Sequence, residues 1–266
     1  MIHFTKMEGL GNDYIYADGI HQRVPLEAEF IKRISDRHFG IGSDGLIVIL
    51  PSETADFKMR IFNADGSEAK MCGNGIRCFA KFCYDHHLTD KKVLQIETLS
   101  GIKTVNLIFN GKHPTAARVS MGPAALMDGG ITHQVEIEGN RYTYHLVSMG
   151  NPHAVVFVND LSLNVNKVGE IISRDTQVDG GVNVEFVQVV NAQEISVRVY
   201  ERGSQETMAC GTGACASAAE SLRQKLTASQ VTVHLLGGDL MIQCLQDDII
   251  MEGPATSVFE GEIQEV

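Results

Sequence analysis

The sequence contains no apolar run long enough to cross a bilayer and no excess of basic residues. Its first six residues, MIHFTK, have none of the character of a secretory signal. It has 22 lysine and arginine residues against 33 aspartate and glutamate residues, a formal net charge of −11. Binding to nucleic acid or to an anionic membrane would need clustered basic residues. We therefore expect a cytoplasmic protein that binds neither.

The six cysteines lack the Cys-x-x-Cys spacing that zinc sites and redox pairs use. Disulfide frameworks are typical of short secreted chains, whereas this chain has 266 residues. We therefore expect reduced thiols and no metal site. Four cysteines are interpreted as small buried apolar side chains without a catalytic role: Cys78, Cys83, Cys215 and Cys244.

The other two cysteines stand in matched glycine-rich segments. Cys72 lies in MCGNG and Cys210 in ACGTG, 138 residues further along (210 minus 72). Each segment comes directly before a stretch with helical spacing. Three more blocks repeat in the same order at nearly the same offset: residues 60–63 with 198–201, 11–13 with 150–152, and 40–44 with 181–185. The pattern indicates an internal duplication.

The length of the chain agrees with two domains, because 266 residues is long for one hydrophobic core. Residues 119–124 resemble residues 250–255, which indicates that the chain crosses between domains at both points. The last dozen residues would then return to complete the first domain. We predict a first domain of residues 1–115 plus 254–266, which carries Cys72, and a second of residues 116–253, which carries Cys210.

Most of the predicted elements are strands, rich in β-branched and aromatic residues and bounded by turn residues. They are residues 2–6, 46–50, 57–62, 103–109, 154–158, 184–190 and 195–200. Helical spacing occurs in residues 26–38, 76–87, 165–174 and 214–226. We therefore predict an α/β (α+β) fold of two pseudo-symmetric domains. Each would be a curved, mainly antiparallel sheet or barrel around a central helix that begins at its cysteine.

The positions of Cys72 and Cys210 predict acid–base chemistry. A thiol has a pKa near 8.5, which a helix N-terminus and nearby N–H donors lower. Such a terminus also binds carboxylates. If an amino acid bound there, its α-carbon would lie between the two thiols, so a thiolate could remove the α-proton while the opposite thiol delivers another. The N–H groups would stabilise the carbanion, and no motif calls for pyridoxal phosphate, flavin or nucleotide.

Several blocks of the sequence together resemble the diaminopimelate epimerase family, over nearly the whole chain. They are residues 9–13, 62–68, 71–77, 149–153, 181–186, 201–203 and 209–213. The resemblance implies two pseudo-symmetric α/β domains with the active site in the cleft between them. It also implies cofactor-independent epimerisation of LL-diaminopimelate to meso-diaminopimelate, a precursor of lysine and peptidoglycan, by a two-base thiol mechanism.

The same resemblance assigns roles to individual residues. Cys72 and Cys210 are the acid–base thiols. The backbone amides on the reacting carboxylate are those of Gly73, Asn74, Gly211 and Thr212. The distal end of the substrate is held by Asn12, Asn63, Asn151, Asn183, Glu201 and Arg202. This mixture suits a second zwitterionic end, because Arg202 can bind a carboxylate as a fork and Glu201 can pair with an ammonium.

Two positions depart from the family pattern. Gln205 stands where the family usually has glycine, and Gly45 stands where some members carry a glutamine that helps to hold substrate. Neither change affects an acid or a base. His153, beside Asn151, is interpreted either as a residue that shapes the site or as a hydrogen-bonded structural histidine.

Two other functions stay open on the residues alone. One is a racemase of another amino acid, such as proline or histidine, although proline racemase-like enzymes typically have histidine where Asn74 stands. The other is a non-catalytic binding module or a thiol redox protein. We expect a small-molecule substrate, and the sequence leaves a monomer and a homodimer both open.

Overall fold

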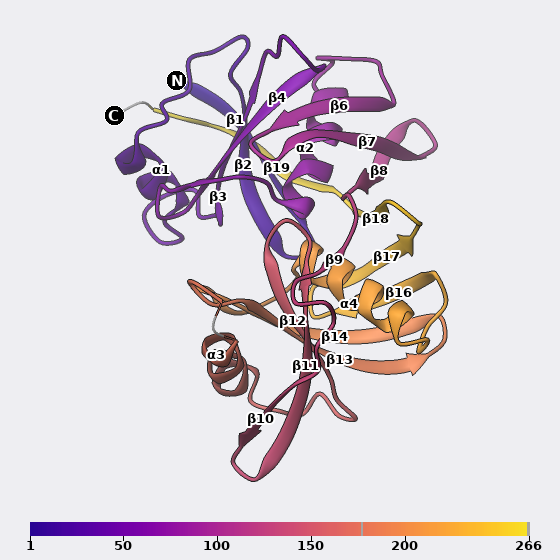
Figure 1. Ribbon diagram of the computed structural model, residues 1–266. Helices are drawn as coiled ribbons and strands as arrows, with labels where there is room; N and C mark the ends of the chain where they lie inside the picture. Colours follow the sequence, from indigo (N-terminus) through magenta and orange to yellow (C-terminus); the bar gives the residue numbers. More distant parts are fainter. Residues whose placement is uncertain (177, 265–266) are drawn as a thin grey trace. The chain divides into compact units, whose positions relative to one another are not determined.

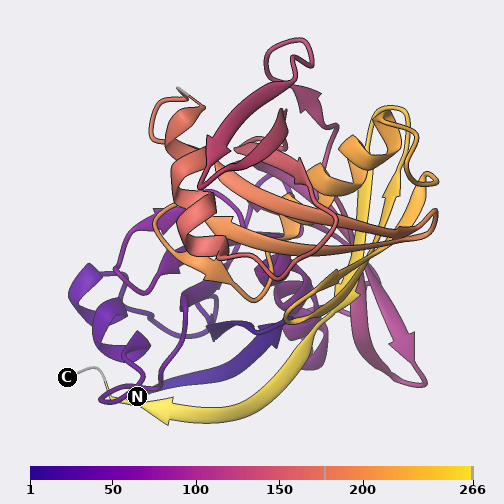
Figure 2. The same cartoon turned by 90° about the horizontal axis from the view of Figure 1, so that it is seen from below.

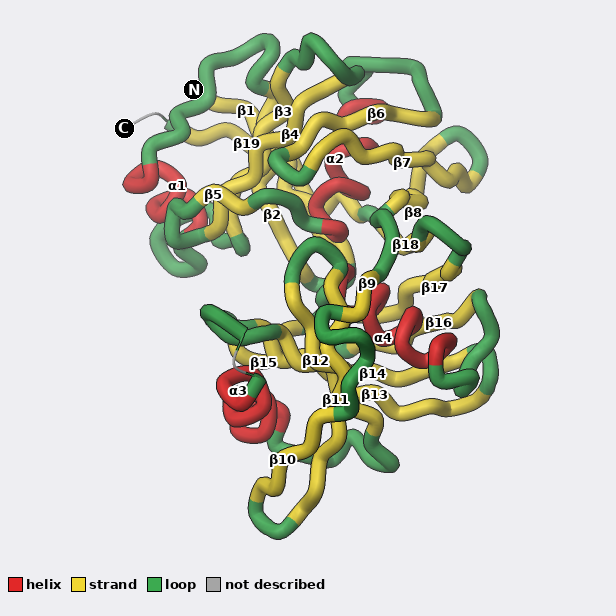
Figure 3. Tube along the Cα trace, in the orientation of Figure 1, coloured by secondary structure: helices red, strands yellow, loops and turns green. Residues whose placement is uncertain are grey.

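The computed structural model describes residues 1–176 and 178–264, and strands are its main secondary structure (Figure 3). The chain divides into two compact units (Figure 1). Unit 1 comprises Met1–Val119 and the segment from Glu252 onward, and unit 2 is Ser120–Met251. The domain boundaries expected after residues 115 and 253 stay a prediction, and residues 265–266 of the expected first domain lie outside the described residues.

Unit 1 is a mixed sheet with two helices. Its strands are β1 (Ile2–Gly9), β2 (Asn12–Asp18), β3 (Gly45–Leu50), β4 (Phe57–Asn63), β5 (Glu68–Ala69), β6 (Val93–Thr98), β7 (Gly101–Asn110), β8 (His113–Ser120) and β19 (Thr256–Ile263). The helices are α1 (Ala28–Ser35) and α2 (Gly73–Asp85). Most neighbouring strands are antiparallel, but β2 pairs with β3, and β4 with β6, in parallel.

Unit 2 repeats this arrangement. Its strands are β9 (Ala125–Leu126), β10 (His133–Ile137), β11 (Asn140–Ser148), β12 (Pro152–Phe157), β13 (Asn183–Asn191), β14 (Glu194–Glu201), β15 (Gln205–Thr207), β16 (Gln230–Leu235), β17 (Gly238–Cys244) and β18 (Ile249–Pro254), whose last three residues belong to unit 1. The helices are α3 (Val165–Asp175) and α4 (Gly211–Arg223). Here β12 with β13, and β14 with β16, are the parallel pairs.

The C-terminal strand β19 occupies in unit 1 the place in the sheet that β10 occupies in unit 2. β10 pairs antiparallel with β11, and β19 pairs antiparallel with β1, the equivalent of β11. Figure 2 shows the two ends of the chain side by side in these strands. The duplicated unit therefore needs a strand before its first hairpin, and in unit 1 the end of the chain supplies it.

The central strand of each unit is buried on both faces. In unit 1, Leu46 and Val48 of β3 pack in a cluster with Ile31 and Ile34 of α1. Ile47 lies on the other face, where it would meet a Cβ placed on Gly75 in the first turn of α2. A strand covered on both faces reads as an unbroken apolar run, which explains the sequence GLIVIL of residues 45–50.

The α-helices and strands expected from the sequence are present, with shifted ends. All seven predicted strands correspond to observed ones, namely β1, β3, β4, β7, β12, β13 and β14. Both cysteine helices begin immediately after their cysteines, at Gly73 and Gly211. The two-domain α/β fold built from a duplication is confirmed. No helix in the described part of the chain is long and apolar enough to cross a membrane.

Strand register corrects one of the sequence matches. Ile15 pairs with Leu46 in unit 1, and Ala154 pairs with Val184 in unit 2. The offset between β3 and β13 is therefore 138 (184 minus 46). The match of residues 40–44 with 181–185 at 141 is wrong, because it aligned two glycine-rich approaches that differ in length.

This register changes which side chains are equivalent. At an offset of 138, Gly45 is equivalent to Asn183, and Ile47 to Glu185. The glutamate therefore lies on the face of β13 that corresponds to an apolar position in unit 1.

Candidate active site

Cys72 is the N-cap residue of α2. Its backbone is extended (φ −136°, ψ 120°), and its sulfur accepts a hydrogen bond from the Gly75 N–H at 3.3 Å. The first turn of α2 holds the glycines and Asn74, so backbone N–H groups cluster at this end of the helix. The half-buried Cys72 thiol therefore lies at the electropositive N-terminus of α2.

Asn12 contacts the Cys72 thiol. The sulfur donates to Asn12 Oδ1 at 3.2 Å, while Asn12 Nδ2 donates to Asp44 Oδ2 at 2.8 Å. Asp44 also accepts from Arg37 at 2.9 Å. Burial raises the pKa of Asp44, and the nearby charge of Asp13 raises it further. The sequence did not single out Asp44 or Arg37.

Cys210 occupies the same position at α4. Its backbone is extended (φ −119°, ψ 112°), and its sulfur accepts from the Gly213 N–H at 3.4 Å. The Thr212 hydroxyl lies 3.5 Å from the sulfur. Cys210 is only 7% exposed. Both cysteines therefore cap their helices in the same way, as the duplication predicts.

The pKa of Cys210 moves against the expectation that a helix terminus lowers it. Burial raises the pKa of this thiol well above its usual range, and the charges of Glu201 and Glu185 raise it further. The Thr212 hydroxyl and the Gly213 N–H act in the opposite direction but are weaker. Burial and the two carboxylates therefore favour the protonated form of the Cys210 thiol, the form that can donate a proton.

A chain of hydrogen bonds connects Cys210 to a buried carboxylate. Asn151 Nδ2 donates to the Thr212 hydroxyl at 3.3 Å, and Asn151 Oδ1 lies 3.1 Å from Nε2 of His153. The other ring nitrogen, Nδ1, lies 2.7 Å from Glu185 Oε1. His153 and Glu185 are both fully buried. His153 therefore lies within hydrogen-bond distance of both Asn151 and Glu185. The sequence does not predict a role for Glu185.

Three residues expected at the distal end of the substrate lie together in unit 2. Asn183 Oδ1 accepts from the Arg202 backbone N–H at 3.2 Å, and the Arg202 guanidinium donates to the Gly181 carbonyl at 3.0 Å. Glu201 ends β14 and accepts from the Thr207 hydroxyl at 2.6 Å. Its effect on the pKa of Cys210 relates it electrostatically to the thiol.

Asn63 occupies the position in unit 1 that Glu201 occupies in unit 2 (201 minus 63 is 138). Its side-chain amide donates to the Ser67 hydroxyl at 3.0 Å. The structure brings Asn12 to Cys72 and Asn151 to the Cys210 end of α4. Asn63 is held by its own turn.

The other cysteines differ in burial. Cys78, Cys83 and Cys215 are at most 1% exposed, whereas Cys244 is half-buried. Burial raises the pKa of Cys78 and of Cys244 to about 11. In the described part of the chain, none of the six cysteines forms a disulfide bond.

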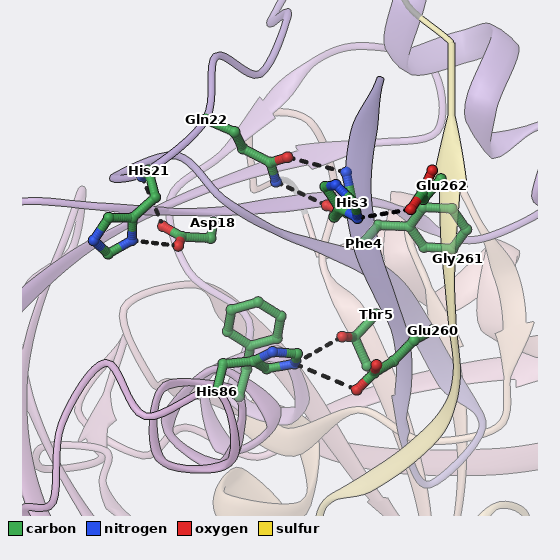
Figure 4. A pocket seen from close by; sticks show the side chains of 11 residues that line it. His3, Phe4, Thr5, Asp18, His21, Gln22, His86, Glu260, Gly261 and Glu262 are labelled. Carbon is green, nitrogen blue, oxygen red and sulfur yellow. Dashed lines mark hydrogen bonds and ion pairs between the residues drawn. The ribbon is translucent and has the colours of Figure 1, made fainter.

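A pocket of about 540 Å³ lies in unit 1 at the other end of α2 (Figure 4). Each carboxylate in it faces a histidine: Asp18 with His21, Glu260 with His86, and Glu262 with His3. The remaining lining residues are Phe4, Thr5, Gln22, Phe82 and Gly261. None of the expected site residues lines this pocket, because a 13-residue helix of roughly 20 Å separates it from Cys72.

Comparisons with known proteins decide the family. The family model for diaminopimelate epimerase matches residues 4–127 and 145–258. This chain belongs to the diaminopimelate epimerase family. A relative with that name from Methanococcus maripaludis strain C5 is 48% identical over 98% of this chain and 99% of its own. Another, from Acetivibrio thermocellus, is 45% identical over 98% of both chains.

Solved structures show the same fold at low sequence identity. A probable proline racemase from Agrobacterium radiobacter K84 superposes with a TM-score of 0.79 and 15% identity, covering 100% of this chain and 94% of that one. A predicted epimerase from Pseudomonas aeruginosa gives 0.75 and 17%, with full coverage of both chains. The epimerase family to which this chain belongs therefore shares its duplicated architecture with racemase-like folds.

Gly45, where some members of the family carry glutamine, cannot carry a side chain on this backbone. Its φ is +151°, and an added Cβ would lie 1.9 Å from the Phe62 carbonyl oxygen. In unit 2 the equivalent position holds Asn183. A polar side chain at this strand position is therefore supplied by one unit only.

Gln205, where the family usually has glycine, has a left-handed backbone (φ +64°). This conformation costs a non-glycine residue about 1 to 2 kcal/mol. Glycine avoids that cost, but its more flexible unfolded chain lowers stability by roughly 0.4 to 1 kcal/mol. We expect Gln205→Gly to raise the free energy of unfolding by about 0.5 to 1 kcal/mol in urea titrations. Gln193→Gly, in a turn without positive φ, should lower it. Equal losses in both variants would contradict the strain at Gln205.

Proposed function

We propose that this protein interconverts LL-diaminopimelate and meso-diaminopimelate without a cofactor, using Cys72 and Cys210 on opposite faces of one α-carbon. The observation that carries the proposal is the pair of cysteines, each capping a helix that begins in a glycine-rich turn. Membership of the diaminopimelate epimerase family supports the choice of substrate.

In the proposed reaction, the α-carboxylate of the substrate binds the backbone amides of Gly73 and Asn74 and those of Gly211 and Thr212. A thiolate removes the α-proton, and the electron pair remains on the α-carbon and its carboxylate. The opposite thiol then delivers its proton to the other face, which inverts the configuration. Donors aimed at developing charge are each worth about 3 kcal/mol in comparable sites, and two helix termini supply several.

The direction of the reaction decides the role of each thiol. A thiol that carries its proton in the resting enzyme is ready to act as the acid, and the raised pKa of Cys210 favours that state. In that direction Cys72 is the base, which it becomes as a thiolate only when substrate is bound, and the two exchange roles in the reverse reaction. A thiolate would form at Cys210 only once substrate and its ammonium groups reduce the cost of charge.

We propose that the distal amino-acid end of the substrate is held by Asn12, Asn63, Asn151, Asn183, Glu201 and Arg202. The contact between Asn183 and the Arg202 backbone supports this assignment. Arg202 is exposed and donates with one guanidinium nitrogen, so the remaining donors suit a carboxylate. Glu201 supplies the opposite charge for an ammonium.

Turnover in deuterium oxide tests the proposal. LL-diaminopimelate incubated with purified, reduced protein should give the meso isomer with deuterium at one α-centre, measured by chiral chromatography and mass spectrometry. The proton removed and the proton delivered reside on different thiols, so the product should carry solvent deuterium. Absence of exchange would refute the two-thiol reaction.

A substrate panel separates this proposal from a racemase of another amino acid. Proline and histidine have no second zwitterionic end, so they should turn over at least about 100-fold more slowly, because they lack the ammonium and carboxylate that Glu201 and Arg202 would bind. Faster turnover of either one would overturn the choice of substrate.

A further inference from the structure

The amide of Asn12 is held in one orientation by Asp44. An amide has an acceptor and a donor end, and Asn12 directs its oxygen to the Cys72 sulfur at 3.2 Å and its nitrogen to Asp44 Oδ2 at 2.8 Å. An ionised carboxylate only accepts hydrogen bonds. A rotated amide would point its oxygen at that carboxylate, so Asp44 selects the orientation in which oxygen faces the thiol.

Asp44 is itself fixed from two sides. Arg37 donates to its Oδ1 at 2.9 Å, and the backbone N–H of Asp13 donates to its Oδ2 at 3.1 Å. The same guanidinium binds both oxygens of the Asp13 carboxylate, at 3.2 and 2.8 Å. Lys6 completes the set, 2.7 Å from Asp13. Two cations therefore balance two carboxylates, and planar fork geometry limits their movement.

Unit 2 braces its equivalent asparagine by a different route. Asn151 is oriented through His153 by Glu185. By strand register, Glu185 is equivalent to Ile47 and not to Asp44. The two carboxylates therefore come from non-equivalent positions of the duplicated unit. What the two units share is an asparagine near the cysteine whose amide is fixed by an acid.

We propose that Asp44, clamped by Arg37, is a positioning residue for Cys72: it keeps the oxygen of Asn12 on the thiol and its amide nitrogen away. An oxygen acceptor stabilises the protonated thiol, whereas an N–H donor would stabilise the thiolate. Asp44 thus favours the protonated state of Cys72 in the ligand-free protein. The role in catalysis rests on the proposed function, but the effect on the thiol does not.

Alkylation of Cys72 tests the effect on the thiol in the ligand-free protein. In Asp44→Ala, Asn12 can rotate and turn its N–H to the sulfur. We expect iodoacetamide to modify Cys72 about fivefold faster at neutral pH, the change that one hydrogen bond gives. Peptide mass spectrometry would measure Cys72 and Cys210 separately, and the rate at Cys210 should not change. Asp44→Asn, whose amide oxygen can still accept from Asn12, should retain the slow rate.

Asp18→Ala is the matched control. Asp18 is the last residue of β2, the strand that begins with Asn12. It accepts from the backbone N–H groups of Ile20 and His21 at 2.8 and 3.3 Å. Its loss should leave the alkylation rate of Cys72 unchanged. An unchanged rate in Asp44→Ala, or an equal rise at Cys210, would overturn the proposal, because the first excludes the brace and the second indicates general loosening.

A double-mutant cycle tests the catalytic consequence. In the direction in which Cys72 delivers the proton, Asp44→Ala should lower kcat about tenfold, but in an Asn12→Ala background it should lower kcat less than about twofold, because both changes remove the same contact. Fully additive losses would refute action through Asn12. If the wild-type protein proves inactive on diaminopimelate, the proposed function fails, while the alkylation result still decides the role of Asp44.

Discussion

Cys72→Ala and Cys210→Ala should each lower kcat for epimerisation by about 1,000-fold or more. Inversion needs a base on one face of the α-carbon and an acid on the other, and alanine supplies neither. Positioned proton transfer contributes about 100- to 10,000-fold at one residue, and here the loss of one residue removes a required step. Formation of meso-diaminopimelate from the LL isomer, followed by chiral chromatography, measures it.

The chain offers a matched control on each of the two helices. Cys78 lies on α2 and Cys215 on α4, both at most 1% exposed. Replacement of either by alanine removes a buried thiol without touching the reaction, so kcat should stay within about threefold although stability falls by about 1 kcal/mol. A Cys72 or Cys210 variant that keeps a tenth of the wild-type rate would exclude a two-thiol mechanism.

Much of the fold could be predicted because local chemistry and tertiary structure agree. The glycines after Cys72 and Cys210 occupy the first turns of α2 and α4, and helix ends of this kind have strong sequence signals. Strands β2 and β6, the parallel partners of β3 and β4, have weaker sequence signals. In β6, buried and exposed residues alternate over only six positions. Pairing with β7, the next strand, and with β4, which lies much earlier in the chain, stabilises it.

The surroundings of the two thiols could not be predicted, because they depend on register. Glu185 lies in an apolar run and reads as an outward residue of a half-exposed strand. β13 is instead covered on both faces: Val184 and Phe186 pack in the core with α3, and Glu185 faces the first turn of α4, where a Cβ on Gly213 would lie 2.5 Å from its Oε1. A carboxylate within such a run was the one available signal.

The role of Asp44 could not be predicted from the sequence either. Its sequence neighbours predict a loop before a strand, which is what the structure contains. Its contact with Asn12 brings together residues 32 positions apart, and this follows from the parallel pairing of β2 with β3. The assignment of Asn12 came from the family resemblance, and only the structure explains what orients it.

Glu185→Gln should lower the free energy of unfolding by about 3 kcal/mol. Glu185 and His153 are both fully buried and lie 2.7 Å apart, and a hydrogen bond to a charged group such as a carboxylate is worth about 1.5 to 3 kcal/mol. The carboxylate also lies at the N-terminus of α4, where negative charge is favoured. Urea unfolding followed by circular dichroism measures the change.

An exposed carboxylate in the same unit provides the control. Glu136 pairs with Arg141 at 3.3 Å, and their side chains are 71% and 65% exposed. Glu136→Gln should change stability by less than about 1 kcal/mol, because solvent screens such pairs. If Glu185→Gln costs no more than Glu136→Gln, the buried carboxylate does not stabilise the fold through its contact with His153. Its second oxygen already lacks a hydrogen-bond partner among the described residues, so Oε1 and its contact with His153 must offset the cost of burying this group.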